Sequence, residues 1–256
     1  MKPRHILVVH YQPHSVLGQM RRLIKQHGLS ARYVARDKLT DRDTKGCDLV
    51  ISIGGDGTFL SVARRVHDSL MLGVNPAPEK KEGFLTRATP ETLGERLGQI
   101  LEDRFAVLNL TRLAPMLDGK ALPLALNEVF VADKDPHQMS YYRLKVEDRD
   151  EFQKSSGVLV ATSTGSHGWL RSAGGIPMPM ISRGFQWHVR DPFSGRLLKP
   201  LLTTGTLDEG EMIAVKSLMD SGIVVVDSTR CSSFKKGSVL TITTSERRLR
   251  FADFPA

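Results

Sequence analysis

Apolar positions follow two different periods along the first hundred residues. Short continuous apolar runs at 5–9 and 49–53 are bounded by turn residues, a pattern typical of buried strands in a parallel sheet. Between them, apolar residues recur at helical spacing from Val16 to Ile24, and Gly28 then ends the predicted helix. This alternation of strand and helix continues to about residue 107. It predicts an α/β, doubly wound, Rossmann-like domain over residues 1–107.

The chain changes character after Val107. Short alternating or continuous apolar runs follow one another, separated by turn residues and without strong helical periodicity. Such a pattern is typical of an all-β sheet or sandwich. We therefore expect a second, all-β sandwich domain over residues 108–256.

A glycine turn, Gly54-Gly55-Asp56-Gly57-Thr58-Phe59, directly follows the strand predicted at 49–53. Glycine lacks a Cβ, so the main chain can fold tightly here and present N–H groups to a phosphate. The Asp56 carboxylate would repel that anion, which favours a role in holding Mg²⁺ or in accepting a proton from an attacking hydroxyl. The alternative is a plain helix cap by Asp56, with the helix running from about Thr58 to Leu70. The spacing fits neither a Walker loop nor a dinucleotide-binding fingerprint.

Two later segments place polar side chains within apolar runs. Asn127-Glu128 interrupts the strand-like run 125–131. Either these side chains bind sugar hydroxyls or a base edge, or Glu128 faces solvent by simple alternation. The second segment, 157–166, runs from a buried strand into four hydroxyl side chains and a glycine, which favours a polar ligand over a plain turn.

The net charge of +8 over 256 residues favours an anionic partner. The basic residues are scattered in short clusters, so the charge indicates a small polyanionic substrate rather than nucleic acid. Cys47 and Cys231 have no metal-ligand spacing, which predicts free thiols in a reducing compartment. We expect a cytoplasmic protein without a membrane span and without metal-ligating protein residues.

The three polar segments together resemble the NAD kinase family. The Gly-Gly-Asp-Gly-Thr turn alone also occurs in diacylglycerol and sphingosine kinases, whereas Asn127-Glu128 and Thr164-Gly165-Ser166 are similar to NAD kinases in particular. A long loop before Gly83-Phe84 and the segment Val189-Arg190-Asp191-Pro192 look like the mitochondrial-type branch. Where many members read Ser-Thr-Ala-Tyr, this chain has Ser166-His167-Gly168-Trp169.

The resemblance implies transfer of the γ-phosphoryl group of ATP to the 2′-hydroxyl of the adenosine ribose of NAD, giving NADP, with Asp56 as the general base. Mg²⁺ or another divalent cation would bridge oxygens of the donor. The resemblance implies phosphate contacts from the turn, by Gly54, Gly55, Gly57 and Thr58. It implies NAD contacts from Phe84, Asn127, Glu128, Thr164, Ser166, His167, Trp169 and Ser172. Arg190 would contact a pyrophosphate.

Some alternatives stay open at this stage. Trp169 would serve equally well in core packing, and His167 as a surface residue beside the pocket. A lipid kinase shares the glycine turn, and an NAD-binding sensor with little activity would share the nucleotide contacts. The resemblance also implies a homodimer or higher homo-oligomer, but the choice between ATP and polyphosphate, or between NAD and NADH, is not predicted.

Overall fold

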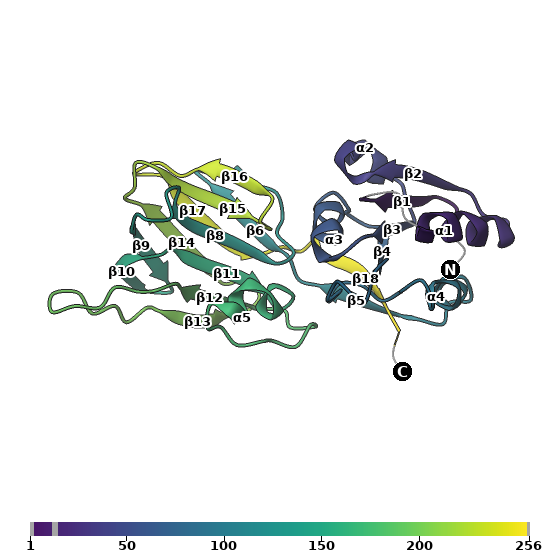
Figure 1. Ribbon diagram of the computed structural model, residues 1–256. Coiled ribbons are helices and arrows are strands. Elements are labelled where there is room, and N and C mark those ends of the chain that lie inside the picture. Colours follow the sequence, from purple (N-terminus) through teal and green to yellow (C-terminus); the bar gives the residue numbers. More distant parts are fainter. Residues whose placement is uncertain (1–2, 12–14, 255–256) are drawn as a thin grey trace. The chain divides into compact units, whose positions relative to one another are not determined.

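The structure is a computed structural model that describes residues 3–11 and 15–254 (Figure 1). The chain divides into two compact units. The first unit comprises residues 1–109 and 249–256, and the second comprises residues 110–248. Among the described residues, no helix is long and apolar enough to cross a membrane.

The first unit is built on a six-stranded sheet in the order β2-β1-β3-β4-β18-β5. Its strands are β1 (Ile6–His10), β2 (Ala31–Ala35), β3 (Leu49–Ile53), β4 (Leu70–Val74), β5 (Ala106–Leu110) and β18 (Leu249–Asp253). Its helices are α1 (Ser15–Gln26), η1 (Arg36–Lys38), α2 (Asp41–Thr44), α3 (Asp56–Ala63) and α4 (Leu93–Leu101). Strands β1 to β4 pair in parallel, and β3 and β4 are buried along their whole length. The predicted α/β domain with a parallel sheet is confirmed.

The second unit contains two six-stranded sheets, in the orders β10-β9-β14-β17-β6-β7 and β13-β12-β11-β8-β15-β16. The strands of the first are β6 (Leu113–Leu117), β7 (Lys120–Ala121), β9 (Ser140–Val146), β10 (Arg149–Ser155), β14 (Met212–Ser217) and β17 (Val239–Thr244). Those of the second are β8 (Glu128–Asp133), β11 (Val158–Thr162), β12 (Phe185–Val189), β13 (Thr204–Leu207), β15 (Gly222–Val226) and β16 (Arg230–Ser233). Two short helices, η2 (Gly165–His167) and α5 (Trp169–Ser172), follow β11.

One apolar core joins both sheets of the second unit. Val129 and Val160 contribute from one sheet and Leu144, Ile213 and Leu240 from the other, all fully buried. The pairs between neighbouring strands are antiparallel. This unit therefore has the β-sandwich character that the sequence predicts.

The last strand differs from the predicted division of the chain, which placed all of residues 108–256 in the second domain. Strand β18 instead pairs in parallel with β4 inside the sheet of the first unit (Figure 1). The Arg87 guanidinium binds the Asp253 carboxylate and lies 4.9 Å from the centre of the Phe251 ring. An alternating run such as 249–253 predicts a strand, but not which sheet receives it, because the pairing partner is chosen by tertiary contacts.

Two predicted helix boundaries also change. The helix after the glycine turn begins at Asp56 and ends at Ala63, so it is shorter than the predicted helix to Leu70. Thr89, Pro90 and Glu91 also predict the start of a helix, but α4 begins at Leu93, where the Leu93 N–H donates to the Thr89 carbonyl at 2.9 Å.

Phe251 should be the main anchor of β18. Its ring is fully buried and meets the ring of Phe59 in α3 edge-on, with centroids 5.6 Å apart. Replacing Phe251 with Ala should therefore lower the free energy of unfolding of the first unit by about 3–5 kcal/mol. The matched control is Phe193→Ala in the second unit, where the ring is 44% exposed and the expected loss is much smaller.

Chemical denaturation can follow the two units separately. Both tryptophans, Trp169 and Trp187, lie in the second unit, so their fluorescence reports on that unit, while circular dichroism reports on the longer helices α1 and α4 of the first. If Phe251→Ala shifts the dichroism midpoint no more than Phe193→Ala does, β18 is not an integral part of the first sheet.

Candidate active site

The glycine turn leads from the carboxyl end of β3 into α3. The Gly54 N–H donates to the Val74 carbonyl at 2.9 Å, which continues the sheet by one residue. A Cβ on Gly54 would lie 2.4 Å from Oγ1 of Thr58, so this position accepts only glycine, and Thr58 is buried beneath the turn. A Cβ on Gly57 would meet nothing within 4 Å. Thr58 therefore fills the space beside Gly54, whereas the space beside Gly57 is open.

The carboxylate of Asp56 binds the backbone of a loop that follows β4. Its Oδ1 accepts the N–H of Leu85 at 2.7 Å, and its Oδ2 accepts the N–H of Phe84 at 3.1 Å. The N-cap of α3 is Gly55, with no side-chain cap, so the alternative of Asp56 as a plain helix cap is wrong. A carboxylate has about four lone-pair positions, and two N–H groups leave the others available to a ligand.

Asn75 organises the loop that Asp56 holds. Its Nδ2 donates to the Lys81 carbonyl at 2.9 Å, and its Oδ1 accepts the N–H of Ala77 at 3.1 Å. The loop also presses against β4, since a Cβ on Gly73 would lie 2.2 Å from the Leu85 carbonyl oxygen. Phe84 is half-buried here. The sequence did not single out Asn75, although its place directly after a buried strand was a usable signal.

Lys81 brings a positive charge to the glycine turn. Its Cδ lies 3.3 Å from the place where a Cβ on Gly55 would stand. The turn itself contains no lysine, unlike a Walker loop. Sequence reasoning counted Lys81 among scattered basic residues, because nothing local indicates that the loop folds back over the turn.

In the second unit, Asp227 fixes the Asn-Glu segment that precedes and begins β8. Its carboxylate accepts the N–H groups of Leu126, Asn127 and Glu128 at 2.9, 2.8 and 3.2 Å. Its own N–H donates to the Glu128 carbonyl at 3.0 Å. Asp227 has a φ of +46°, which is unusual for a residue with a side chain and indicates a position held by its surroundings. Sequence reasoning missed Asp227, although a carboxylate that ends an apolar run is a recognisable signal.

Glu128 is buried beside this second carboxylate, so the interpretation of Glu128 as a solvent-facing residue is wrong. Burial, with the neighbouring Asp227 charge adding to it, raises the pKa of Glu128 to about 7, although the Ser228 hydroxyl donates to its Oε1 at 3.2 Å. Burial also raises the pKa of Asp227, against the effect of its three N–H donors and of the buried Arg112. The pair therefore holds less than two full negative charges near neutral pH.

The hydroxyl segment packs on the Asn-Glu segment. A Cβ on Gly165 would lie 2.1 Å from the Asn127 carbonyl oxygen, so the two backbones touch there. Thr162 donates to the Leu126 carbonyl at 2.6 Å, and Ser166 donates to the Ser163 carbonyl at 2.6 Å and accepts the N–H of Met178 at 2.8 Å. These hydroxyl groups form hydrogen bonds with the protein's own backbone, whereas the sequence pattern predicted only a polar ligand for this segment.

Two polar atoms of this region have no protein partner. Oδ1 of Asn127 and Oγ1 of Thr164 are buried and make no hydrogen bond to any described part of the chain. Leaving a buried polar atom unpaired is costly, so such atoms indicate a position where a ligand or water completes the bonding. Among the predicted NAD contacts, Asn127 and Thr164 thus have the clearest capacity for a further bond.

The remaining predicted contacts lie around α5. Trp169 packs on Phe130, with ring centroids 4.7 Å apart, and the Arg190 guanidinium lies 5.4 Å from the Trp169 ring and 5.5 Å from the Phe130 ring. His167 donates through Nε2 to the Met178 carbonyl at 2.8 Å. Ser172 is exposed at the end of α5. Trp169 is half-buried against Phe130, and a ligand contact for these four residues stays a prediction.

Comparison with known proteins identifies relatives that share one family. The model of the ATP-NAD kinase N-terminal domain matches residues 10–105. A probable NADH kinase of Oryza sativa subsp. japonica is 30% identical over 220 residues, which cover 77% of this chain and 68% of the relative. An NAD kinase of Halobacterium salinarum is 32% identical over 226 residues, covering 82% of this chain and 78% of the relative.

Two solved structures share the fold. An NAD kinase from Archaeoglobus fulgidus in complex with ATP has a TM-score of 0.81 at 24% identity, covering 96% of this chain and 92% of that one. A yeast NADH kinase complexed with NADH has a TM-score of 0.84 at 14% identity, covering 98% and 84%. At these identities the likeness is one of architecture, and it confirms the predicted two-part fold.

The raised pKa of Glu128 makes stability depend on pH. The carboxyl ionises near 4.5 in the unfolded chain and near 7 in the folded one, so the contribution of Glu128 to folding stability is highest below pH 4.5 and falls as the pH rises to about 7. Glu128→Gln removes the ionisation and should therefore raise the free energy of unfolding by about 3 kcal/mol at pH 8, but by less than about 1 kcal/mol at pH 5.

Urea denaturation at both pH values measures this difference. The exposed Glu246→Gln variant is the control and should leave stability nearly unchanged at either pH. A stability gain for Glu128→Gln that is the same at pH 5 and pH 8 would contradict the raised pKa.

Proposed function

The chain belongs to the NAD kinase family of ATP-dependent phosphotransferases, and on that premise we propose that it transfers the γ-phosphoryl group of ATP to the 2′-hydroxyl of the adenosine ribose of NAD, giving NADP. The observation that carries the proposal is the Asp56 carboxylate, fixed at the first position of α3 by the N–H groups of Phe84 and Leu85. A carboxylate at a phosphate-binding turn suits a reaction in which a hydroxyl must lose a proton as it attacks.

Asp56 is the general base. The bond from the ribose 2′-oxygen to the γ-phosphorus forms, the bond from that phosphorus to the bridging β–γ oxygen breaks, ADP leaves, and the hydroxyl proton passes to Asp56. The two N–H groups on the carboxylate restrict its rotation, so its remaining lone pairs are held in place before the acceptor arrives. Phosphoryl transfer relies mainly on such positioning and on charge neutralisation.

The donor phosphates are bound at the amino end of α3. The first N–H groups of a helix have no intrahelical acceptor and attract anions. Gly57 leaves that end open, whereas the Gly54 N–H already donates to Val74, so Gly54 serves the shape of the turn and not the direct phosphate contact predicted for it. The side chain of Lys81, whose Cδ approaches Gly55, adds a positive charge to this region.

Mg²⁺ accompanies the nucleotide in this proposal. The described residues contain no cluster of three or more His, Cys, Asp or Glu side chains that could hold a metal ion. Mg²⁺ in kinase sites is commonly held largely by substrate phosphates and water, so in this proposal the donor phosphates would hold the ion and Asp56 stays available to accept the hydroxyl proton. When bound, the ion would neutralise charge on the transferring phosphoryl group.

The second unit binds NAD. The unpaired Oδ1 of Asn127 and Oγ1 of Thr164 suit hydroxyl or amino donors of the nucleotide, and Glu128 suits ribose hydroxyls. Arg190, held against two aromatic rings, presents a guanidinium that suits a pyrophosphate. Phe84, Ser166, His167, Trp169 and Ser172 remain proposed contacts of the same ligand. The acceptor is NAD, NADH or both, and the assay below decides between them.

A cytoplasmic location and self-association complete the proposal. Both cysteines are free thiols, which suits a reducing compartment. Large apolar side chains of the segment between α5 and β13 are 68–86% exposed, namely Ile176, Ile181, Leu197 and Leu201. Exposed apolar side chains that gather into one patch are typical of protein interfaces, and on that ground we take these four as support for a homodimer or higher homo-oligomer.

Asp56→Asn should lower the rate of NADP formation roughly 10²–10⁴-fold, because the amide cannot accept the hydroxyl proton. NADP is measured with an NADP-specific dehydrogenase after incubation with ATP, Mg²⁺ and either NAD or NADH. The amide also has one acceptor oxygen in place of two, so some loss of stability is expected as well.

A matched control separates these two effects. Glu151 uses both carboxylate oxygens to accept the N–H groups of Leu201 and Leu202, as Asp56 does with Phe84 and Leu85. Glu151→Gln should therefore lose comparable stability and keep its rate. A wild-type protein that forms no NADP, or an Asp56→Asn variant as active as wild type, overturns the proposed function.

Light scattering during gel filtration tests self-association. We expect a mass at least twice the 28.4 kDa of the chain. A Leu197→Glu/Leu201→Glu variant should shift the protein toward the monomer, while Met116→Glu, at a 43% exposed site elsewhere in the second unit, should not. A wild-type mass of one chain would contradict the oligomer.

A further inference from the structure

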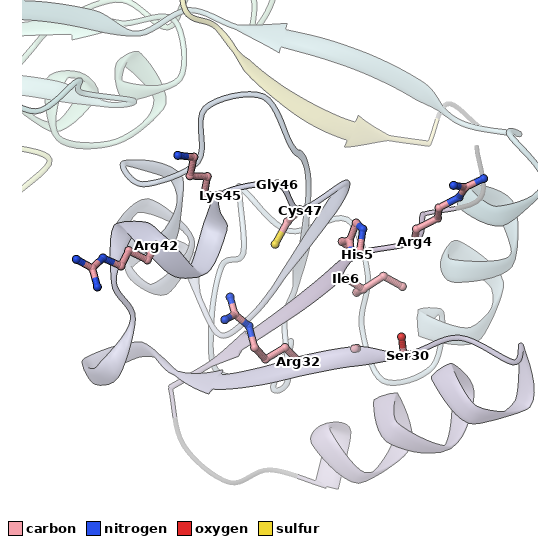
Figure 2. A pocket seen from close by; sticks show the side chains of 10 residues that line it. Arg4, His5, Ile6, Ser30, Arg32, Arg42, Lys45, Gly46 and Cys47 are labelled. Atoms are coloured by element: carbon pink, nitrogen blue, oxygen red, sulfur yellow. The ribbon is translucent and has the colours of Figure 1, made fainter.

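A hollow of about 650 Å³ opens at the amino ends of three strands of the first unit (Figure 2). Ile6 and Ala31 begin β1 and β2, and Cys47 lies just before β3. The complete lining is Arg4, His5, Ile6, Ser30, Ala31, Arg32, Arg42, Lys45, Gly46 and Cys47. None of the residues in this lining belongs to the glycine turn or to the predicted NAD contacts.

The lining is strongly basic. Arg4, Arg32, Arg42 and Lys45 come from three separate segments, and none of the described residues that line the hollow is acidic. Figure 2 shows Arg42 and Lys45 along one side and Arg4 on the opposite side. Positive charges around a concave surface produce a positive potential inside it, so the arrangement favours a bound anion.

The nearest carboxylates are already occupied by the protein. Oδ2 of Asp48 accepts the N–H groups of Arg4 and His5 at 2.7 and 2.9 Å, and these bonds lower the pKa of Asp48. Oδ2 of Asp43 accepts the N–H and the hydroxyl of Thr40, which lower the pKa of Asp43, while its Oδ1 lies 3.2 Å from Nη1 of Arg32. Arg32 is thereby partly neutralised, and the charge of Asp48 also acts on Arg4. Arg42 and Lys45 also line the hollow, and they form no ion pair with a carboxylate among the residues described.

The hollow is separate from the glycine turn. It lies before the amino end of β3, and the turn follows the carboxyl end of the same strand. A strand of five residues spans roughly 17 Å. A nucleotide bound at the turn therefore does not occupy the hollow as well, because the length of β3 separates the two places.

We propose that this hollow is a second anion site, which binds a small molecule carrying two or more linked phosphates. Its volume suits a ligand of nucleotide size. Arginine guanidinium groups bind phosphate oxygens in pairs, and Asp43 holds Arg32 in place for such contacts. The Ser30 hydroxyl in the lining is a further donor. Cations on opposite sides of one concavity suit linked phosphates better than a single phosphate.

Cys47 provides a local reporter for the test. Its thiol is half-buried in the lining, whereas the other free thiol, Cys231, is exposed in the second unit. The probe is inorganic triphosphate, added to the full chain before slow alkylation at alkaline pH, since burial raises the pKa of Cys47. Mass spectrometry of the peptides then gives the alkylation rate at each cysteine.

We expect triphosphate to slow alkylation of Cys47 roughly tenfold when about nine tenths of the sites are filled, with no change at Cys231. Orthophosphate and sodium chloride at equal ionic strength should protect far less. The Arg42→Gln/Lys45→Gln variant should lose the protection, and the control Lys235→Gln/Lys236→Gln, which removes the same charge from exposed positions of the second unit, should keep it. Activity is not part of the readout, so the result is independent of the proposed reaction.

Two results would overturn the second site. One is an unchanged Cys47 rate at millimolar triphosphate. The other is equal slowing by sodium chloride, which would reduce the effect to general screening of the basic surface. Circular dichroism of each variant shows that it is folded, so loss of protection reports on binding alone.

Discussion

The N–H groups of Phe84 and Leu85 donate hydrogen bonds to the Asp56 carboxylate, and the rest of the first unit's site depends on these two bonds. They tie α3 to the loop after β4, and so they set the positions of Lys81 and Phe84 as well as that of Asp56. Hydrogen bonds from backbone N–H groups to a carboxylate are stronger than neutral ones, and each N–H that lost its acceptor in this half-buried place would be costly. The same residue is therefore structural and, in our proposal, catalytic.

In the second unit, too, a carboxylate fixes a backbone segment by accepting its N–H groups. The Asp227 carboxylate accepts three consecutive N–H groups of the segment that contains Asn127 and Glu128. These hydrogen bonds help to keep the backbone of Asp227 in its left-handed conformation. Burial raises the pKa of Glu128, and the charge of the neighbouring Asp227 adds to that effect. Fixing a binding segment by its backbone leaves side chains such as Asn127 available for a ligand. In our proposal, a carboxylate that belongs to the framework of each unit holds polar groups in position for the substrate.

The sequence predicted the local elements well and the long-range pairings poorly. Helical spacing from Val16 and the glycine at 28 correctly predicted α1, and the apolar run 49–53 correctly predicted β3, because burial on one stripe or on both faces leaves a clear pattern. The placement of β18 beside β4 could not be predicted, since any strand-like run carries the same pattern. Asp227 was missed for the same reason, as its partners lie about a hundred residues away.

The basic charge shows a similar limit. In the sequence, Arg4, Arg32, Arg42 and Lys45 are isolated residues, and the net charge of +8 looks dispersed. The parallel order of β1, β2 and β3 brings their amino ends to one edge of the sheet, and the four side chains then line one hollow. Charge that is scattered along a chain is thus concentrated by topology, which no local pattern reveals.

A crystal structure of the complex with NAD tests the central claim most directly. The account predicts that the 2′-oxygen of the adenosine ribose lies about 2.6–3.2 Å from a carboxylate oxygen of Asp56, with the bonds from Phe84 and Leu85 still in place. If the 2′-oxygen is instead bonded to a different basic group, and Asp56 contacts only the two N–H groups of the loop, then Asp56 is a structural clamp and not the base.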